Sequence, residues 1–216
     1  MLRRRWRQVT AQEGAVTGLE GKLDRLVRTV ARYMAYVGGL TLIALTIITC
    51  VSIIGRGLAT LSYSDFMETS LPAVSDMMKA MKFGPIPGDF EIVEAGIAFA
   101  IFSFLPWCQI TRGHATVDII TSMFSLRANR VLDVITEILM SFVLVLIAWR
   151  LWIGMLDKHR YGETSFILQF PVWWSFLISA IAAVIAAAIS LWMIWVRLRE
   201  LKTGHPVYGG EQGAIH

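Results

Sequence analysis

Charged residues are scarce in this chain of 216 amino acids. They make up only 17% of it, whereas soluble domains average about 25%. Hydrophobic residues make up 56%, eight tryptophans among them, and the few charges lie between long apolar runs. The composition excludes a soluble globular domain and predicts a polytopic membrane protein.

Cysteine is almost as scarce. The two cysteines, Cys50 and Cys108, both lie inside apolar runs. This placement argues against a disulfide framework and against a thiolate metal site. Both are expected to act as small apolar side chains.

The residue patterns of enzymes are missing as well. All four histidines (His114, His159, His205 and His216) lie outside the apolar runs, whereas a b-type haem anchor needs histidines within the bilayer. No Ser/His/Asp set, Walker motif or phosphate-binding glycine loop occurs. We therefore predict no enzyme, no cofactor and no metal.

Four apolar runs are present, each long enough to cross a hydrocarbon core of about 30 Å. They predict an all-α membrane domain over residues 34–196, with spans at about 34–54, 92–111, 134–155 and 172–196. A long polar connection, 55–91, separates the first two spans. Pro72 is suited to begin a short helix within it, and Asp89 is placed to cap the second span. Gly38 and Gly39 would let the first span pack closely on a neighbour.

Both ends of the chain are polar. Residues 1–33 form a basic tail whose later part has helical apolar spacing opposite Lys22, Arg25 and Arg28. This pattern predicts an amphipathic helix lying in the headgroup plane, or alternatively an extension of the first span that packs on a partner protein. Residues 197–216 form a short polar tail.

Basic residues predict the orientation. Four spans place both termini on one side, and that side collects most of the lysine and arginine, including eight basic residues before Tyr33. Both termini should therefore be cytoplasmic. The basic excess favours contact with anionic lipids, and no soluble domain is present that could bind nucleic acid.

Several charges lie within the spans, where they are costly and commonly functional. Glu94 and Arg150 lie toward the outer end, whereas Arg112, Asp133 and Glu137 lie toward the inner end. We predict two ion pairs between the second and third spans: Glu94 with Arg150, and Arg112 with Glu137 or Asp133. The alternative is that each side chain reaches the nearest headgroups alone. The middle of the membrane carries no charge, which suits a scaffold better than a carrier of charged solutes.

Two segments carry a family resemblance: FSFLPWCQITRGHATVDI and YGETSFILQFPVWWSF. Together they resemble the small, DctQ-like membrane subunit of tripartite ATP-independent periplasmic (TRAP) transporters over about residues 30–200. The matching positions are Arg112, Gly113, His114, Val117, Asp118, Gly162, Thr164, Pro171 and Trp173. The long first connection departs from the family, since many members have a shorter one.

The resemblance implies a small permease subunit in a bacterial inner membrane. It would brace a large sodium-coupled membrane subunit, with a periplasmic binding protein delivering an organic acid such as a dicarboxylate, keto acid or sugar acid. Membrane lipids would be further partners. Because the second span exits on the cytoplasmic side, we expect Arg112, His114 and Asp118 to form a tight inner turn that holds helices. A role for His114 as a substrate or metal ligand is disfavoured.

Two other functions remain open from the residues. An autonomous four-span homodimeric transporter would need a membrane carboxylate, for which Glu94 or Glu137 would have to serve. A membrane anchor of a redox enzyme is disfavoured by the positions of the histidines.

Overall fold

Six helices make up most of the computed structural model, which describes residues 19–81, 84–111 and 126–203. They are α2 (Leu19–Ser62), α3 (Asp65–Ser70), α4 (Pro72–Ala80), α5 (Asp89–Ile110), α7 (Leu126–Tyr161) and α8 (Trp173–Thr203). Four of them, α2, α5, α7 and α8, are long and apolar enough to cross a membrane. The predicted all-α fold with four spans is therefore confirmed.

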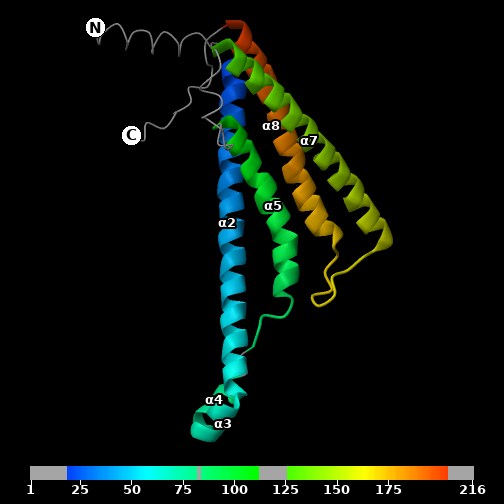
Figure 1. Ribbon diagram of the computed structural model, residues 1–216. Helices are drawn as coiled ribbons and strands as arrows, with labels where there is room; N and C mark the ends of the chain where they lie inside the picture. Colours follow the sequence, from blue (N-terminus) through cyan, green and yellow to red (C-terminus); the bar gives the residue numbers. More distant parts are fainter. Residues whose placement is uncertain (1–18, 82–83, 112–125, 204–216) are drawn as a thin grey trace, which may run out of the picture.

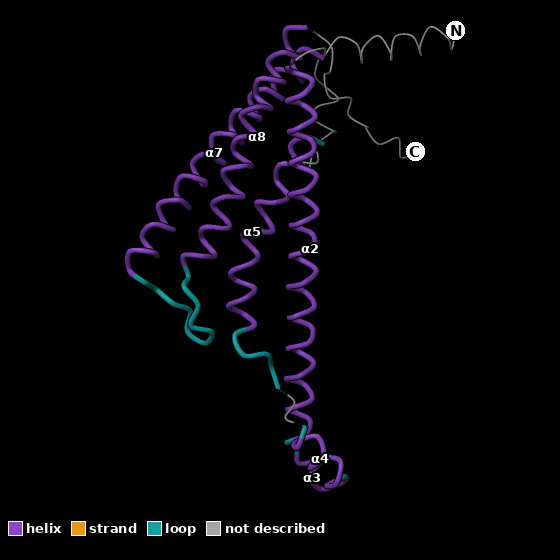
Figure 2. Tube along the Cα trace, turned by 180° about the vertical axis from the view of Figure 1, so that it is seen from behind, coloured by secondary structure: helices purple, strands orange, loops and turns teal. Residues whose placement is uncertain are grey.

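The four long helices are arranged as a fan (Figure 1). Helix α7 packs along α8, α8 packs against α5, and α5 packs against α2. The last helix of the chain thus lies between the second and third spans. The start of α2 and the end of α8 lie at one end of the fan, here called the termini end. The α7–α8 connection and the short helices lie toward the other, here called the hairpin end (Figure 2).

Small residues allow α8 to occupy this central position. Five of its alanines are buried: Ala180, Ala182, Ala183, Ala186 and Ala187. Two of them form a core cluster with Leu144 and Ala148 of α7, against which Phe102 and Leu105 of α5 also pack. Small side chains let helix backbones approach closely, so α8 can contact a helix on each side.

Tryptophans mark the two ends of α8. Trp173 and Trp174 lie at its start, and Trp192 and Trp195 lie near its other end. Trp195 lies 22 residues after Trp173, about 33 Å along the helix at 1.5 Å per residue, which is close to the thickness of the hydrocarbon core. This spacing agrees with two aromatic belts.

The basic segment before the first span forms no separate interfacial helix within the described residues. From Leu19 it belongs to the unbroken helix α2. Its Ala31 is fully buried in a cluster with Ile110, Ile189 and Met193, and Val27 packs against that cluster. Of the two predicted alternatives, the described residues agree with an extension of the first span, whose apolar side packs on α5 and α8 of the same chain.

The connection predicted at 55–91 is mostly helical. Helix α2 has 44 residues and is about 66 Å long, twice the length of α5. Its last ten residues extend about 15 Å past Ser52, which contacts the start of α5. Beyond them α3 and α4 form a small cap (residues 63–81), and Pro72 begins α4 as predicted.

The start of the second span also differs from the prediction. Gly88, whose φ of 75° is in the left-handed region, is the N-cap of α5, and Asp89 is the first helical residue. The carboxylate of Asp89 serves both the helix start and α2: one oxygen accepts the backbone N–H of Phe90 (2.8 Å), and the other accepts the hydroxyl of Ser52.

Substitution of Gly38 tests the close packing between α2 and α5. A Cβ atom there would lie 2.8 Å from Cβ of Ser103, whereas one at Gly57 of the same helix meets nothing within 4 Å. We expect Gly38→Ala to lower the free energy of unfolding by about 1–3 kcal/mol through overpacking. Gly57→Ala, the matched control, should be neutral or stabilising because alanine favours the helix. Thermal unfolding in detergent measures both; equal effects of the two changes would contradict the close contact.

Candidate functional site

Residues 162–172 join α7 to α8 as a short hairpin. Thr164 and Pro171 form an antiparallel bridge. The N–H of Ser165 donates to the carbonyl of Phe170 (2.9 Å), and the N–H of Val172 donates to the carbonyl of Glu163 (3.0 Å). This segment contains the predicted motif residues Gly162, Thr164 and Pro171, and Trp173 directly follows it as the first residue of α8, so the motif marks one structural unit.

Glu91 fastens this hairpin to α5. Its side chain is buried, and its two carboxylate oxygens accept the backbone N–H groups of Ile167 (2.7 Å) and Leu168 (2.9 Å). Leu168 also lies very close to Gly88: a Cβ atom added at Gly88 would lie 2.5 Å from Cγ of Leu168. Hydrogen bonds to a charged acceptor are among the stronger ones in proteins, so Glu91 fixes the hairpin against the second span.

A second polar link joins α5 to α2 at the same end. The hydroxyl of Ser52, which is fully buried, donates to Asp89 (2.5 Å) and accepts the N–H of Ile86 (3.2 Å). Arg56 lies 3.8 Å from the same carboxylate. These contacts fix the depth at which the second span begins relative to the first.

Trp173 joins the ends of α7 and α8. Its ring meets the ring of His159 edge-to-face, with centroids 4.9 Å apart, and lies 5.8 Å from the ring of Trp174. Trp173, one of the positions that carry the family resemblance, thus pairs the ends of two helices within the chain. His159 serves as an aromatic partner here.

Glu137 of α7 pairs with α8. Its carboxylate lies 3.9 Å from Nε of Arg197, and both side chains are almost completely buried, 11% and 4% exposed. The predicted partner, Arg112, lies outside the described residues, as do His114 and Asp118. The observed pair follows from the fan, in which α8 is the direct neighbour of α7.

Glu94 and Arg150 do not form the predicted ion pair, although both belong to the described part of the chain. Both side chains are exposed, and the ion pairs of the described residues do not include them. The reason is the position of α8, which separates α5 from α7. Glu94 instead lines a cavity of about 350 Å³ between α5, α8 and the hairpin.

The cap presents apolar residues on its surface. Exposed members are Tyr63, Phe66, Leu71, Val74, Met77 and Met81. The cap is held by a bond from the Ser75 hydroxyl to the carbonyl of Ser62 (2.8 Å), and Lys79 bridges Glu68 and lies over the Tyr63 ring. The hydrogen bond to Glu68 raises the pKa of Lys79, so this lysine stays charged. Large apolar groups exposed on a folded surface commonly mark a contact site.

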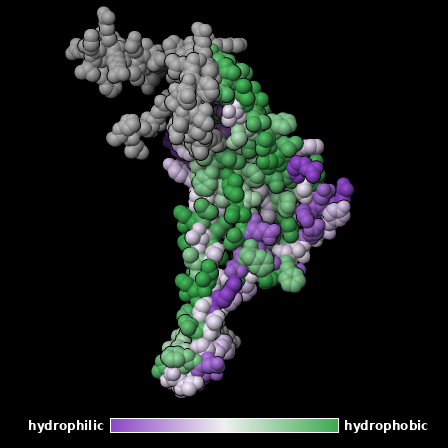
Figure 3. All heavy atoms as spheres, in the orientation of Figure 1, coloured by the Kyte–Doolittle hydropathy of each residue, from purple (hydrophilic) through white to green (hydrophobic). Residues whose placement is uncertain are grey.

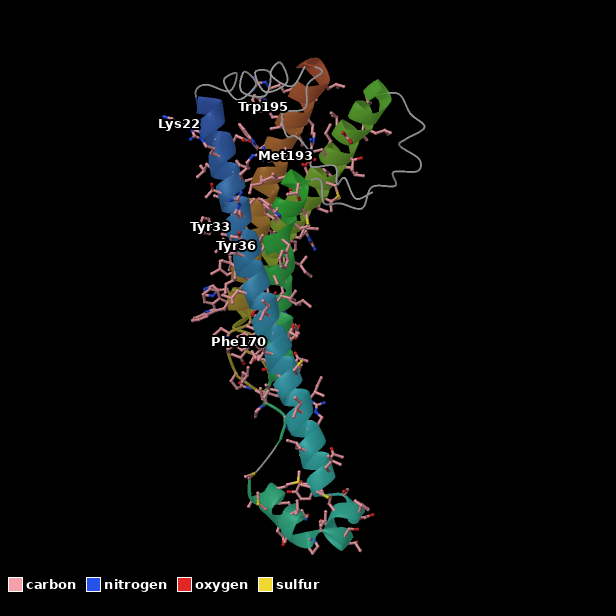
Figure 4. The ribbon with its side chains drawn as sticks, turned by 90° about the vertical axis from the view of Figure 1, so that its left-hand side faces the viewer. Lys22, Tyr33, Tyr36, Phe170, Met193 and Trp195 are labelled. Carbon is pink, nitrogen blue, oxygen red and sulfur yellow. The ribbon has the colours of Figure 1, made fainter. Side chains whose placement is uncertain are left out.

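The distribution of polarity agrees with a membrane body. Figure 3 shows apolar residues over the long helices and hydrophilic ones around the hairpin end and the cap. In Figure 4, Met193 and Trp195 lie near one end of the molecule with Lys22, and Phe170 lies toward the other. Among the described residues, no group of three or more His, Cys, Asp or Glu could hold a metal ion.

Sequence reasoning missed three of these contacts: Glu91 with the hairpin, Ser52 with Asp89, and Arg197 with Glu137. An acidic residue in a first helical turn is ordinary, so Glu91 gave no distinct signal. Arg197 lies just after the apolar run and was assigned to the tail. Glu137 lies three residues inside the start of the run 134–155, and Arg197 directly follows the run 172–196, so both lie at the termini-end limit of their runs; this was the available clue.

The comparisons with known proteins give one match. A family model described as "Tripartite ATP-independent periplasmic transporters, DctQ component" matches residues 73–200, more than half of the chain. The matched region begins in α4 and includes α5, α7, the hairpin and most of α8. No curated protein and no solved structure matches the chain.

The Glu91 clamp predicts a local change in hydrogen exchange. Glu91→Ala removes the acceptor for two backbone N–H groups, which costs about 1–3 kcal/mol when such groups are left unsatisfied. Amides of Ile167 and Leu168 should then exchange roughly tenfold or more faster. Glu94→Gln, one turn away on the same helix and outside these bonds, is the control. Unchanged exchange in Glu91→Ala would show that the clamp does not hold the hairpin.

The buried pair of Glu137 and Arg197 predicts a strongly non-additive mutant cycle. Glu137→Ala removes this carboxylate from a guanidinium that is only 4% exposed and should cost about 1–3 kcal/mol. Replacing both residues by apolar ones should cost less than the sum of the single changes. Glu68→Ala, which breaks an exposed pair on the cap, should cost at most about 1 kcal/mol. Additive losses at Glu137 and Arg197, measured by denaturation in detergent, would argue against the pair.

Proposed function

This chain belongs to the DctQ family of TRAP transporter components, and we propose that it is the small permease subunit that braces the large membrane subunit. This proposal rests on the observation that carboxylates at the ends of the spans make contacts within the chain. Glu91 binds the hairpin, Asp89 binds α2, and Glu137 pairs with α8. These three carboxylates thus hold the described helices together.

The middle of the membrane supports the same function. Between Glu94 and Ile110 of α5, and between Glu137 and Arg150 of α7, the sequence has no charged residue. Helix α8 has none before Arg197. Pathways for ions or protons use ionisable groups within the bilayer, so a chain without them at mid-depth is suited to scaffolding.

A partner surface is available on the edge of the fan. Helix α2 contacts α5 on one side, and much of its remaining surface is apolar and exposed: Tyr33, Tyr36, Leu40, Ile43 and Ile47. Tyr33 and Tyr36 extend away from the other helices in Figure 4. We propose that the large membrane subunit covers part of this edge, with lipid covering the rest.

The proposed orientation follows from the basic residues. With both termini cytoplasmic, the hairpin and the cap face the periplasm. There they would lie on the side from which a binding protein delivers its organic acid. The multi-pass chain would reside in the bacterial inner membrane. The resemblance assigns the substrate and sodium sites to the large subunit, so this chain does not determine which acid is carried.

The test is reconstitution of this chain with a large TRAP membrane subunit from the same organism. The two should purify together, and vesicles should take up the organic acid only when both are present, together with the binding protein and a sodium gradient. The competing function, an autonomous transporter, predicts uptake by this chain alone. Sodium-independent uptake by this chain alone, lost in Glu94→Gln or Glu137→Gln, would overturn the proposal.

A further inference from the structure

The cavity beside Glu94 is the feature of the molecule that the scaffold function does not use. It lies where the fan opens toward the hairpin end, and its volume of about 350 Å³ falls within the range of ligand-binding pockets. Helix α5 forms one wall, α8 and Leu151 of α7 form the other, and the hairpin closes the end. Four phenylalanines line it: Phe90, Phe166, Phe170 and Phe176.

The polar groups in this cavity have unused bonding capacity. The carboxylate of Glu94 lines the cavity and makes no ion pair or hydrogen bond within the described structure. Ser179 lines it too; this residue is 2% exposed, and its hydroxyl has no hydrogen-bond partner among the described residues. Glu91 also borders the cavity, but its oxygens are occupied by the hairpin. A buried hydroxyl without a partner is uncommon in folded proteins and points to a missing ligand.

The chemistry of the walls selects the ligand. A carboxylate at the edge of an apolar region attracts a cation, and phenyl faces also favour a cation over an anion. Arg150 of α7 is exposed and forms no ion pair with Glu94 among the described residues. The ammonium group of such a ligand would pair with the carboxylate of Glu94 and donate a hydrogen bond to the hydroxyl of Ser179. Alternatively, a neighbouring oxygen of the ligand would accept a hydrogen bond from that hydroxyl. The apolar body of the ligand would fill the space between the phenylalanines.

We propose that the cavity lined by Glu94 and Ser179 binds the ammonium headgroup and upper acyl chain of an aminophospholipid from the leaflet at the hairpin end. The depth fits this occupant. Glu94 lies five residues, or about 7.5 Å, inside the start of α5. It lines the cavity together with Ser175 and Phe176 from the first turn of α8, which directly follow the two tryptophans in sequence. Headgroup and acyl chain meet at this level of a bilayer. Glu94 is exposed, so the site is open to the lipid.

Lipid titration of the full-length chain in detergent tests this site. Native mass spectrometry would compare phosphatidylethanolamine, which has the ammonium group, with phosphatidylglycerol, which lacks it. We expect phosphatidylethanolamine to bind about tenfold more tightly. Glu94→Gln should abolish most of that preference while leaving phosphatidylglycerol binding unchanged. Ser179→Ala should weaken phosphatidylethanolamine binding by a smaller factor.

Asp157→Asn is the matched control, because it removes an exposed carboxylate at the same end that does not line the cavity. It should leave the lipid preference intact. Equal binding of the two lipids, or an equal preference in wild type and Glu94→Gln, would overturn the proposal. A third outcome would also overturn the proposal: a Glu94→Gln variant that binds lipid normally but no longer purifies with the large membrane subunit. That outcome would show that Glu94 pairs with a cation of the protein partner.

Discussion

The close packing of α8 is the constraint on which the rest of this structure depends. Its buried alanines let α7 and α5 approach it from two sides, and this places the last helix of the chain between the second and third spans. In a bilayer, apolar burial gives little advantage over contact with lipid, so such association depends on close packing and on polar contacts. A larger side chain at Ala183 or Ala187 would separate both neighbours at once.

Polar contacts then fix the ends of the fan. Glu91 holds the hairpin, Ser52 and Asp89 align the first two spans, and Arg197 with Glu137 joins the last two at the termini end. The bilayer makes each of these groups costly to leave unsatisfied. A chain that uses most of these charges in internal contacts has few left for solute movement. This is the physical argument behind the bracing role proposed for it within its family.

Hydropathy was sufficient to predict four spans, because the length of an apolar run is set by the membrane. It could not predict which spans are neighbours. The predicted Glu94–Arg150 pair is wrong because α5 and α7 are consecutive membrane helices in the chain but are separated in space by α8. Helix α2 continues past the membrane because nothing in residues 55–62 stops it, and a polar helix there resembles a loop by composition. The contact of Glu91 spans 76 residues and has no local signature.

The order of the helices is the central claim, and disulfide trapping in native membranes measures it most directly. In a background without Cys50 and Cys108, paired cysteines would replace one of Leu144 or Ala148 on α7 and one of Ala183 or Ala187 on α8. At least one of these pairs should form a disulfide under mild oxidation, since the four residues form one buried cluster. A pair at Glu94 and Arg150 should remain reduced. Efficient bridging of Glu94→Cys to Arg150→Cys, with none between α7 and α8, would contradict the fan described here.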